Sequence, residues 1–146
     1  MNVLPGEIID IITEDEISLV RIRMDDRVFS SVVLDTPATS PYLRTANPVK
    51  LLFKETEVII AKTSSLAISV QNKIECVIKT IKKGKILCEL ALDICDGQAE
   101  GAPASRQRRQ IRSIITRNAC EQLDLRENDT ITALIKTNEV SLSAND

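Results

Sequence analysis

The sequence contains an internal repeat, and this repeat constrains the fold more than any other feature. When Ser31-Val32-Val33 is set on Ser113-Ile114-Ile115, an offset of 82 residues, the two copies match without a gap as far as Val58 and Val140. Apolar residues alternate in phase in both copies, and both copies end on the pattern Lys-x-x-Glu-Val. Such self-similarity predicts two similar structural units in tandem.

The front parts of the two copies match at a smaller offset of 70 residues, which places Asn2 on Asn72, Ile8 on Ile78 and Val20 on Leu90. The second copy therefore carries an insert, which we expect at about residues 96–110. This division predicts a degenerate first repeat at residues 1–64 and a second repeat at residues 65–146. Each repeat alone is near the size at which a hydrophobic core is marginal, so we expect the repeats to pair or the chains to assemble.

Composition excludes several classes of function. With 19 basic and 21 acidic side chains the chain is close to neutral, and with two Phe, one Tyr and no Trp it lacks stacking platforms, so nucleic-acid binding is not expected. The chain contains no His, and no nucleophile lies beside a plausible activating base, so we do not expect an enzyme. No signal peptide and no membrane span is visible, which predicts a cytoplasmic protein without a membrane partner.

The four cysteines, Cys76, Cys88, Cys95 and Cys120, lack a Cys-x-x-Cys spacing, and three of them lie in or beside apolar runs. Buried free thiols are the favoured interpretation, with disulfides or a metal site as alternatives.

Alternating apolar residues predict strands at 7–12, 17–24, 28–34, 49–53 and 57–61 in the first copy. The second copy repeats this order with strands at 74–81, 85–94, 130–136 and 139–142. Residues 35–48 contain three prolines and predict a loop, whereas the corresponding part of the second copy predicts a short helix that Asn118 can cap. The predicted fold class is all-β, with two five-stranded barrels of the oligonucleotide/oligosaccharide-binding (OB) type in tandem and a short helix in the second repeat.

The insert is rich in Gly, Ala, Pro, Ser and Gln, and carries Arg106, Arg108 and Arg109, with Arg112 just after it. It could be a long hairpin loop or a basic patch for nucleic acid, and its composition favours the loop.

Small hydrogen-bond donors gather at predicted strand ends of the second copy. They are Ser69, Asn72, Thr116 and Thr137, the last beside Lys136, together with the turn Lys82-Lys83-Gly84. Each of these residues is also an ordinary turn or cap residue when taken alone, and Lys136 could be a solvated lysine at a strand end.

Taken together, five segments of the second copy resemble the molybdate-binding Mop, or TOBE, family in its tandem, di-Mop arrangement. The segments are Ile68-Ser69-Val70-Gln71-Asn72, Ile81-Lys82-Lys83-Gly84, Ser113-Ile114-Ile115-Thr116, Glu121-Gln122-Leu123 and Ala133-Leu134-Ile135-Lys136-Thr137. The family commonly opens on Ser-Ala-Arg-Asn, so this sequence departs from it at Val70 and Gln71. The first copy departs further, with Met1 in place of the basic residue and Glu55 after Lys54.

The resemblance implies cytoplasmic binding of the oxyanion molybdate, or tungstate, for storage, homeostasis or sensing. It implies cages of hydroxyls, backbone amides and lysine between the subunits of a homo-oligomer, with a trimer favoured and a dimer possible. No cofactor is implied, and metal enters only as the oxyanion. The implied oxyanion-binding residues are Ser69, Val70, Gln71, Asn72, Lys83, Gly84, Ser113, Thr116, Lys136 and Thr137, with Lys54 as a weaker member. The alternative is a regulatory or structural interaction module in which oxyanion binding is weakened or lost.

Overall fold

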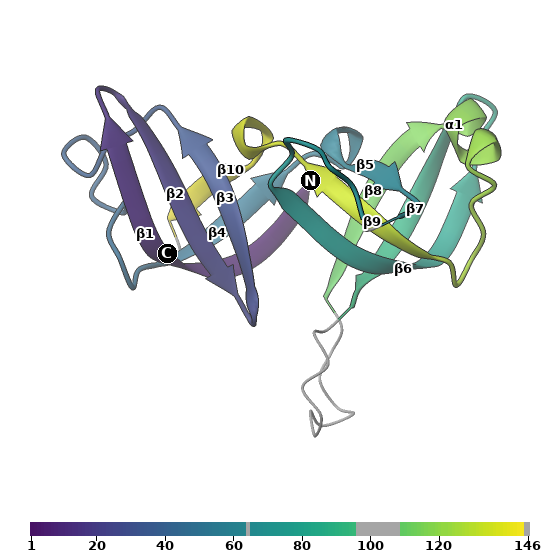
Figure 1. The fold of residues 1–146 in the computed structure, drawn as a ribbon, viewed down its shortest axis with the longest axis horizontal. Coiled ribbons are helices and arrows are strands. Elements are labelled where there is room, and N and C mark those ends of the chain that lie inside the picture. The colour runs from purple at the N-terminus through teal and green to yellow at the C-terminus, as the bar shows by residue number, and fades with distance from the viewer. Residues whose placement is uncertain (64, 96–108, 145–146) are drawn as a thin grey trace, which may run out of the picture. The chain divides into compact units, whose positions relative to one another are not determined.

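The computed structural model describes residues 1–63, 65–95 and 109–144. Over these ranges the chain forms ten β-strands, one α-helix and two short 3-10 helices (Figure 1). In chain order they are β1 Asn2–Glu14, β2 Ile17–Met24, β3 Arg27–Val33, β4 Pro48–Phe53, η1 Glu55–Glu57, β5 Ile59–Ala61, β6 Asn72–Lys83, β7 Leu87–Ile94, β8 Gln110–Thr116, α1 Arg117–Gln122, β9 Thr130–Ile135, η2 Thr137–Glu139 and β10 Ser141–Ala144. No helix within these ranges has both the length and the apolar character needed to cross a membrane.

The strands form two five-stranded sheets of the same topology. One sheet has the order β10-β4-β1-β2-β3 and the other the order β5-β9-β6-β7-β8. Each strand of the first sheet occupies the place of its repeat counterpart in the second, so that β1 corresponds to β6, β4 to β9 and β10 to β5. The predicted all-β class with two OB-like units is confirmed.

The two compact units do not coincide with the predicted repeat bounds, because each unit is closed by a strand from the other copy. Unit 1 consists of Met1–Lys54, Val70–Asn72 and the chain from Ile135 onward, whereas unit 2 consists of Glu55–Ser69 and Lys73–Leu134. In unit 1, β10 of the second repeat pairs antiparallel with β4, and in unit 2, β5 of the first repeat pairs antiparallel with β9. The bounds 1–64 and 65–146 describe the sequence repeat and remain a prediction.

Two buried hydrogen bonds accompany this exchange of closing strands between the two copies. The hydroxyl of Ser31 donates to the carbonyl of Val140 at 2.5 Å in unit 1, and the hydroxyl of Ser113 donates to the carbonyl of Val58 at 2.8 Å in unit 2. Ser31 and Ser113 are equivalent at the offset of 82, as are Val58 and Val140. The two bonds are therefore one interaction made reciprocally, each copy holding the closing segment of the other.

A β-bulge recurs at the same place in the two copies. The ladder between β1 and β2 shifts between Ile8 and Asp10, and the ladder between β6 and β7 shifts between Ile78 and Thr80. These positions correspond at the offset of 70, so the front parts of the two repeats share their local geometry.

Strand β1 begins at Asn2, earlier than the predicted start at residue 7, and the prediction was wrong because it took Pro5-Gly6 as a strand breaker. The ladder between β1 and β2 begins only at Glu7, while β4 pairs with the earlier residues, so Pro5 has a strand partner on one side only. A proline is tolerated there because no ladder bond on the other side is lost. A Cβ atom at Gly6 would overlap the side chain of Ile22, so only glycine fits at this position without displacing that side chain.

The predicted short helix is present as α1, but its cap differs from the prediction. Thr116 is the N-cap, and its hydroxyl oxygen accepts the N–H of Ala119 at 3.1 Å. Asn118 lies inside the helix, so its prediction as the cap was wrong; β8 runs on to Thr116 and places that hydroxyl at the first turn. The predicted insert lies mostly at residues 96–108, outside the described residues, and its interpretation as a loop remains a prediction.

Equivalent apolar residues fill the two cores. Leu43 and Leu125 are 2% and 4% exposed, and Phe53 and Ile135 are 2% and 1% exposed. Cys76, Cys88 and Cys120 are also buried, in agreement with their apolar surroundings in the sequence, and Cys95 is half-buried. The repeat pattern therefore predicted which side chains face inward in each unit.

One position of the turn before β4 gives a stability prediction. Ala46 has φ 66° and its equivalent Asn128 has φ 73°, a left-handed conformation that asparagine tolerates better than alanine. We expect Ala46→Asn to stabilise unit 1 by about 1 kcal/mol, and Asn128→Ala to destabilise unit 2 by a similar amount. Thermal unfolding of the two variants should shift the midpoint in opposite directions, and a change of the same sign in both would contradict this explanation.

Candidate functional site

The implied oxyanion-binding residues are distributed over both units. Unit 1 contains Lys54, Val70, Gln71, Asn72, Lys136 and Thr137, and unit 2 contains Ser69, Lys83, Gly84, Ser113 and Thr116. All six of those in unit 1 lie within three residues of a point at which the chain passes from one unit to the other, namely 54/55, 69/70, 72/73 and 134/135.

The buried side chain of Asn72 binds β3 of unit 1 through two hydrogen bonds, which we call the clamp. Its side-chain oxygen accepts the N–H of Ser30 at 2.8 Å, and its side-chain nitrogen donates to the carbonyl of Ser30 at 2.9 Å. Asn72 is 2% exposed and Ser30 is 9% exposed, so both hydrogen bonds are shielded from water. Asn72 thus fixes the start of β6 against β3. Its neighbours Val70 and Gln71 are half-buried and exposed, respectively.

Lys136 lies where β9 leads into η2, in the same unit. The residue is exposed, and its carbonyl accepts the N–H of Glu139 at 3.0 Å, which forms the 3-10 turn. Helix η2 contacts β3, and the carbonyl of Val140 just beyond it is held by Ser31. Among the described residues no carboxylate forms an ion pair with the ammonium group of Lys136. Unit 1 therefore presents an uncompensated cation on a turn whose backbone is fixed.

Thr137 follows Lys136 and is half-buried, whereas the corresponding residue of the first copy, after Lys54, is Glu55. The first copy thus has a carboxylate where the second has a hydroxyl. A carboxylate accepts hydrogen bonds and carries a negative charge, so it disfavours an anion where a hydroxyl can donate to one.

In unit 2, Lys83, Gly84 and Thr116 come together at one end of the sheet. Lys83 pairs with Cys88 across the β6–β7 hairpin, and Thr116 pairs with Leu87 on the other side of β7. The N–H of Gly84 donates to the carbonyl of Leu87 at 2.8 Å, and a Cβ atom at Gly84 would lie 2.6 Å from that oxygen. Gly84 is therefore required by the tight turn that brings Lys83 beside β7.

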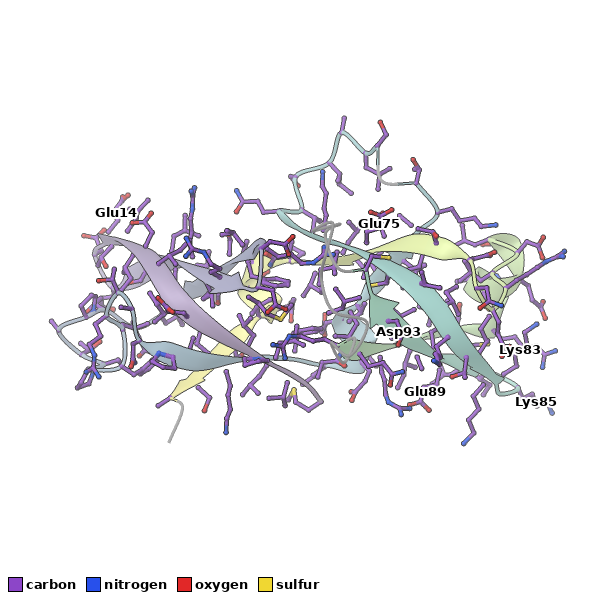
Figure 2. The ribbon with its side chains drawn as sticks, turned by 90° about the horizontal axis from the view of Figure 1, so that it is seen from below. Glu14, Glu75, Lys83, Lys85, Glu89 and Asp93 are labelled. Carbon is purple, nitrogen blue, oxygen red and sulfur yellow. The ribbon has the colours of Figure 1, made fainter. Side chains whose placement is uncertain are left out.

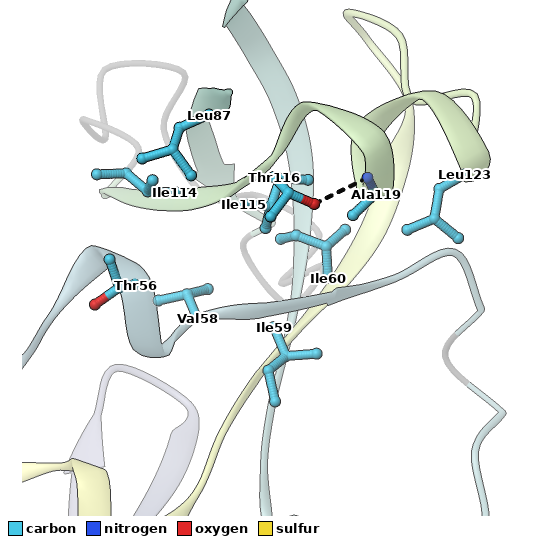
Figure 3. A pocket seen from close by; sticks show the side chains of 10 residues that line it. All are labelled: Thr56, Val58, Ile59, Ile60, Leu87, Ile114, Ile115, Thr116, Ala119 and Leu123. Carbon is cyan, nitrogen blue, oxygen red and sulfur yellow. Dashed lines mark hydrogen bonds between the residues drawn. The ribbon is translucent and has the colours of Figure 1, made fainter. Parts of the chain in front are cut away.

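Ser113 is committed to structure. It is fully buried, and its hydroxyl proton is used in the bond to Val58 that holds the exchanged strand. Ser69, in contrast, is exposed. The hydroxyl of Thr116 accepts from Ala119 and keeps its own proton free for donation (Figure 3).

A buried thiol pair lies beside this end of unit 2. Burial raises the pKa of the Cys120 thiol, and the neighbouring Cys88, which shares a hydrogen bond with it, raises it further. The positive charge of Lys83 acts to lower this pKa, so the ammonium group lies close enough to interact electrostatically with Cys120. Sequence reasoning placed these thiols in the core but did not associate them with Lys83, because the two strand positions and the helix position are far apart in the chain.

Each unit has a groove between the strand of the other copy and its own third strand. In unit 2 the groove has a volume of about 350 Å³ and is lined mainly by apolar residues, including Ile59, Ile60, Ile114 and Leu123 (Figure 3). The equivalent groove of unit 1, about 360 Å³, is more polar and contains Tyr42. Burial raises the pKa of Tyr42, and the charge of Asp35 and a hydrogen bond to it act in the same direction. Of the residues that line the unit 2 groove, only Thr56 and Thr116 have side chains that can donate a hydrogen bond to a dianion.

Nothing in the described residues indicates a metal centre, because they contain no cluster of three or more His, Cys, Asp or Glu side chains that could hold a metal ion. What the site residues share is the ability to donate hydrogen bonds: ammonium groups, hydroxyls and backbone N–H groups at strand ends. Such a set suits an anion that carries no proton.

Comparisons with known proteins identify a domain family and a shared fold. A family profile described as the TOBE domain matches residues 68–142, just over half of the chain. Among solved structures, the chain is similar to the cytoplasmic molybdate-binding protein ModG, in a PEG-grown crystal form with molybdate bound. The TM-score is 0.84 at 22% sequence identity, and the match covers 99% of this chain and 96% of that one, which shows a shared fold. No curated protein matches the chain significantly.

The clamp formed by Asn72 gives a second prediction. Asn72→Ala removes both bonds to Ser30 and leaves a buried N–H and carbonyl without these partners, so we expect a loss of about 2 kcal/mol of unfolding free energy. The matched control is Gln71→Ala at the exposed neighbouring position, which should leave stability unchanged. Urea denaturation measures both; equal stability of the two variants would mean that the clamp is dispensable.

Proposed function

The chain belongs to the TOBE domain family, and from that premise we propose that it binds molybdate or tungstate in the cytoplasm without chemical turnover. The fold shared with ModG, a cytoplasmic molybdate-binding protein, supports this proposal. The observation that carries it is the exposed, unpaired ammonium group of Lys136, on a turn held against β3.

The chemistry of the anion matches donors of this kind. Molybdate is a tetrahedral dianion without a proton at neutral pH, so it accepts hydrogen bonds at every oxygen and donates none. In unit 1, Lys136 would provide a charge-assisted hydrogen bond and Thr137 a hydroxyl donor, and in unit 2, Thr116 and Ser69 would provide hydroxyl donors. Asn72 orients the strand end rather than contacting the anion, since its side chain is already bonded to Ser30. Lys83 and Gly84 would provide a second cationic and backbone contact.

A cage in which every group donates hydrogen bonds, here called a donor-only cage, discriminates between oxyanions. Phosphate carries a proton over much of the neutral range, and this proton would face a donor at a cost of about 1–3 kcal/mol. Tungstate has nearly the same size and charge as molybdate and should bind similarly. Sulfate is smaller and also unprotonated, so only the size of the cage can exclude it.

The two copies should differ in affinity. The second copy has Thr137 after its lysine, whereas the first has Glu55 after Lys54, and a carboxylate close to a bound dianion repels it. The second copy is itself weakened at one position, because Gln71 lacks the charge of the basic residue expected there. We propose that the cage containing Lys136 is the stronger site and that Lys54 contributes to a weaker one.

We further propose that the chain assembles as a homo-oligomer, with a trimer favoured, and that its cages lie between subunits. Storage, homeostasis and sensing all fit such an assembly. If oxyanion binding has been lost, the remaining function is that of a regulatory or structural interaction module.

Calorimetric titration tests the proposal directly. We expect heat of binding with molybdate and with tungstate, and none with sulfate or phosphate at the same concentrations. Binding of phosphate as tight as molybdate would contradict the donor-only cage. Absence of binding for all four anions would leave the interaction module as the function.

Replacement of Lys136 by Met tests the proposed contact. The variant keeps the apolar stem but loses a charge-assisted hydrogen bond, so affinity should fall about ten- to a hundredfold. At about a hundred times its dissociation constant, molybdate should stabilise the wild type by roughly 2.7 kcal/mol per site, and the variant should show a much smaller thermal shift. Lys54→Met should reduce the shift less, and Lys73→Met, at an exposed lysine outside the site, should not change it. An undiminished shift in Lys136→Met, with normal circular dichroism, would place the anion elsewhere.

A further inference from the structure

The same hairpin turn carries opposite charges in the two units. In unit 1 the β1–β2 hairpin has Glu14 at the end of β1 and Asp15 and Glu16 in the turn. In unit 2 the same hairpin has Lys82 and Lys83 at the end of β6 and Lys85 in the turn before β7, within two residues of the equivalent positions 84–86. We call these the acidic turn and the basic turn; Figure 2 labels Glu14 on the first and Lys83 and Lys85 on the second. The repeat thus preserves the hairpin and reverses its charge.

These charges form no ion pairs within the part of the chain that the structure describes. All six side chains are exposed, and none forms an ion pair with another described residue. Glu89, which lies opposite Lys82 in the β6–β7 ladder, pairs with Arg112 at 2.9 Å, and Glu121 pairs with Arg117 at 3.0 Å. The guanidinium group of Arg117 also donates to the carbonyl of Gly84, which adds positive charge beside the basic turn.

Exposed apolar side chains accompany both turns. Ile12 and Ile17 flank the acidic turn at 54% and 48% exposure. Ile86 and Leu87 belong to the basic turn at 75% and 49% exposure. Leu34, 81% exposed, follows the end of β3, which pairs with the start of β2 beside the acidic turn. Apolar side chains next to charges of one sign are typical of a protein interaction surface.

The charge signs restrict how two copies can meet through these surfaces. Two acidic turns repel each other, and so do two basic turns, so a two-fold contact of like with like is disfavoured. We propose that the acidic turn of one copy binds the basic turn of a second copy, in a head-to-tail contact. A contact of this kind links different surfaces of identical chains and closes into a ring when the rotation permits. This inference goes beyond the proposed function, because it needs no bound anion and names the surfaces through which copies meet.

Charge reversal tests the contact at side chains other than those proposed to bind the anion. One variant is Glu14→Lys with Glu16→Lys, which spares Asp15 because its φ of 54° suits few residues. The second is Lys82→Glu with Lys85→Glu, which spares Lys83. The third combines all four substitutions and so exchanges the signs of the two turns. Lys62→Glu with Lys73→Glu is the control, since it changes the net charge as much as the second variant at exposed positions outside the turns.

Sedimentation velocity over a range of protein and salt concentrations gives the readout. The wild type should exceed the 16.2 kDa of one chain, and each two-residue reversal should weaken self-association at least about tenfold. The combined variant and an equimolar mixture of the two reversals should associate again, whereas the control should behave as the wild type. Salt should weaken association in the wild type and in the combined variant alike.

The inference fails if the wild type is monomeric, if either reversal leaves association unchanged, or if the combined variant does not recover it. Should a reversal disturb folding, as judged by circular dichroism, the neutral pair Lys82→Gln with Lys85→Gln must still weaken association. Calorimetry with molybdate on the wild type separates the two proposals. Association through the turns without anion binding would remove the proposed function and leave this contact intact.

Discussion

The rest of the structure depends on the reciprocal closure of each unit by a strand of the other copy. Each closure consists of an antiparallel ladder, β10 on β4 or β5 on β9, and one buried hydrogen bond from a serine hydroxyl to a valine carbonyl. Without it, the edge of β4 or β9 would expose unpaired backbone groups. Neither repeat therefore contains a complete sheet of its own. The turn that carries Lys136 also belongs to a closing segment, so the exchange positions the candidate site as well as the fold.

Much of the fold was predictable from the sequence because the offset of 82 aligns side chains that share a burial state, such as Leu43 with Leu125 and Phe53 with Ile135. The exchange was not predictable, for a physical reason. The atom that Ser31 contacts is a backbone carbonyl, and the carbonyls of Val58 and Val140 are chemically identical. No side chain distinguishes closure within a repeat from closure between repeats. The N-cap was misassigned for a similar reason, since Thr116 and Asn118 are both good caps and only the end of β8 decides between them.

The candidate site, like the fold, was predictable from the sequence only in part. The sequence indicated which donors lie at predicted strand ends, and in the structure Asn72 holds the start of β6 through two hydrogen bonds to Ser30. It also shows that Ser113, which shares the chemistry of Ser69, is used up in packing, because burial rather than residue type determines whether a hydroxyl is available. The contrast between Thr137 and Glu55 was visible in the sequence alone, since a change from hydroxyl to carboxylate reverses the sign of the interaction with an anion.

The exchanged strands also determine how this chain must fold. Two separate repeats would have to find each other by diffusion before either sheet could close, and their folding would depend on protein concentration. The segment between β5 and β6 joins them, and a short linker of this kind gives an effective concentration on the order of millimolar. Closure thus becomes an intramolecular step. Cleavage of that segment would leave both closing ladders in place, yet it would turn refolding from a first-order into a second-order reaction.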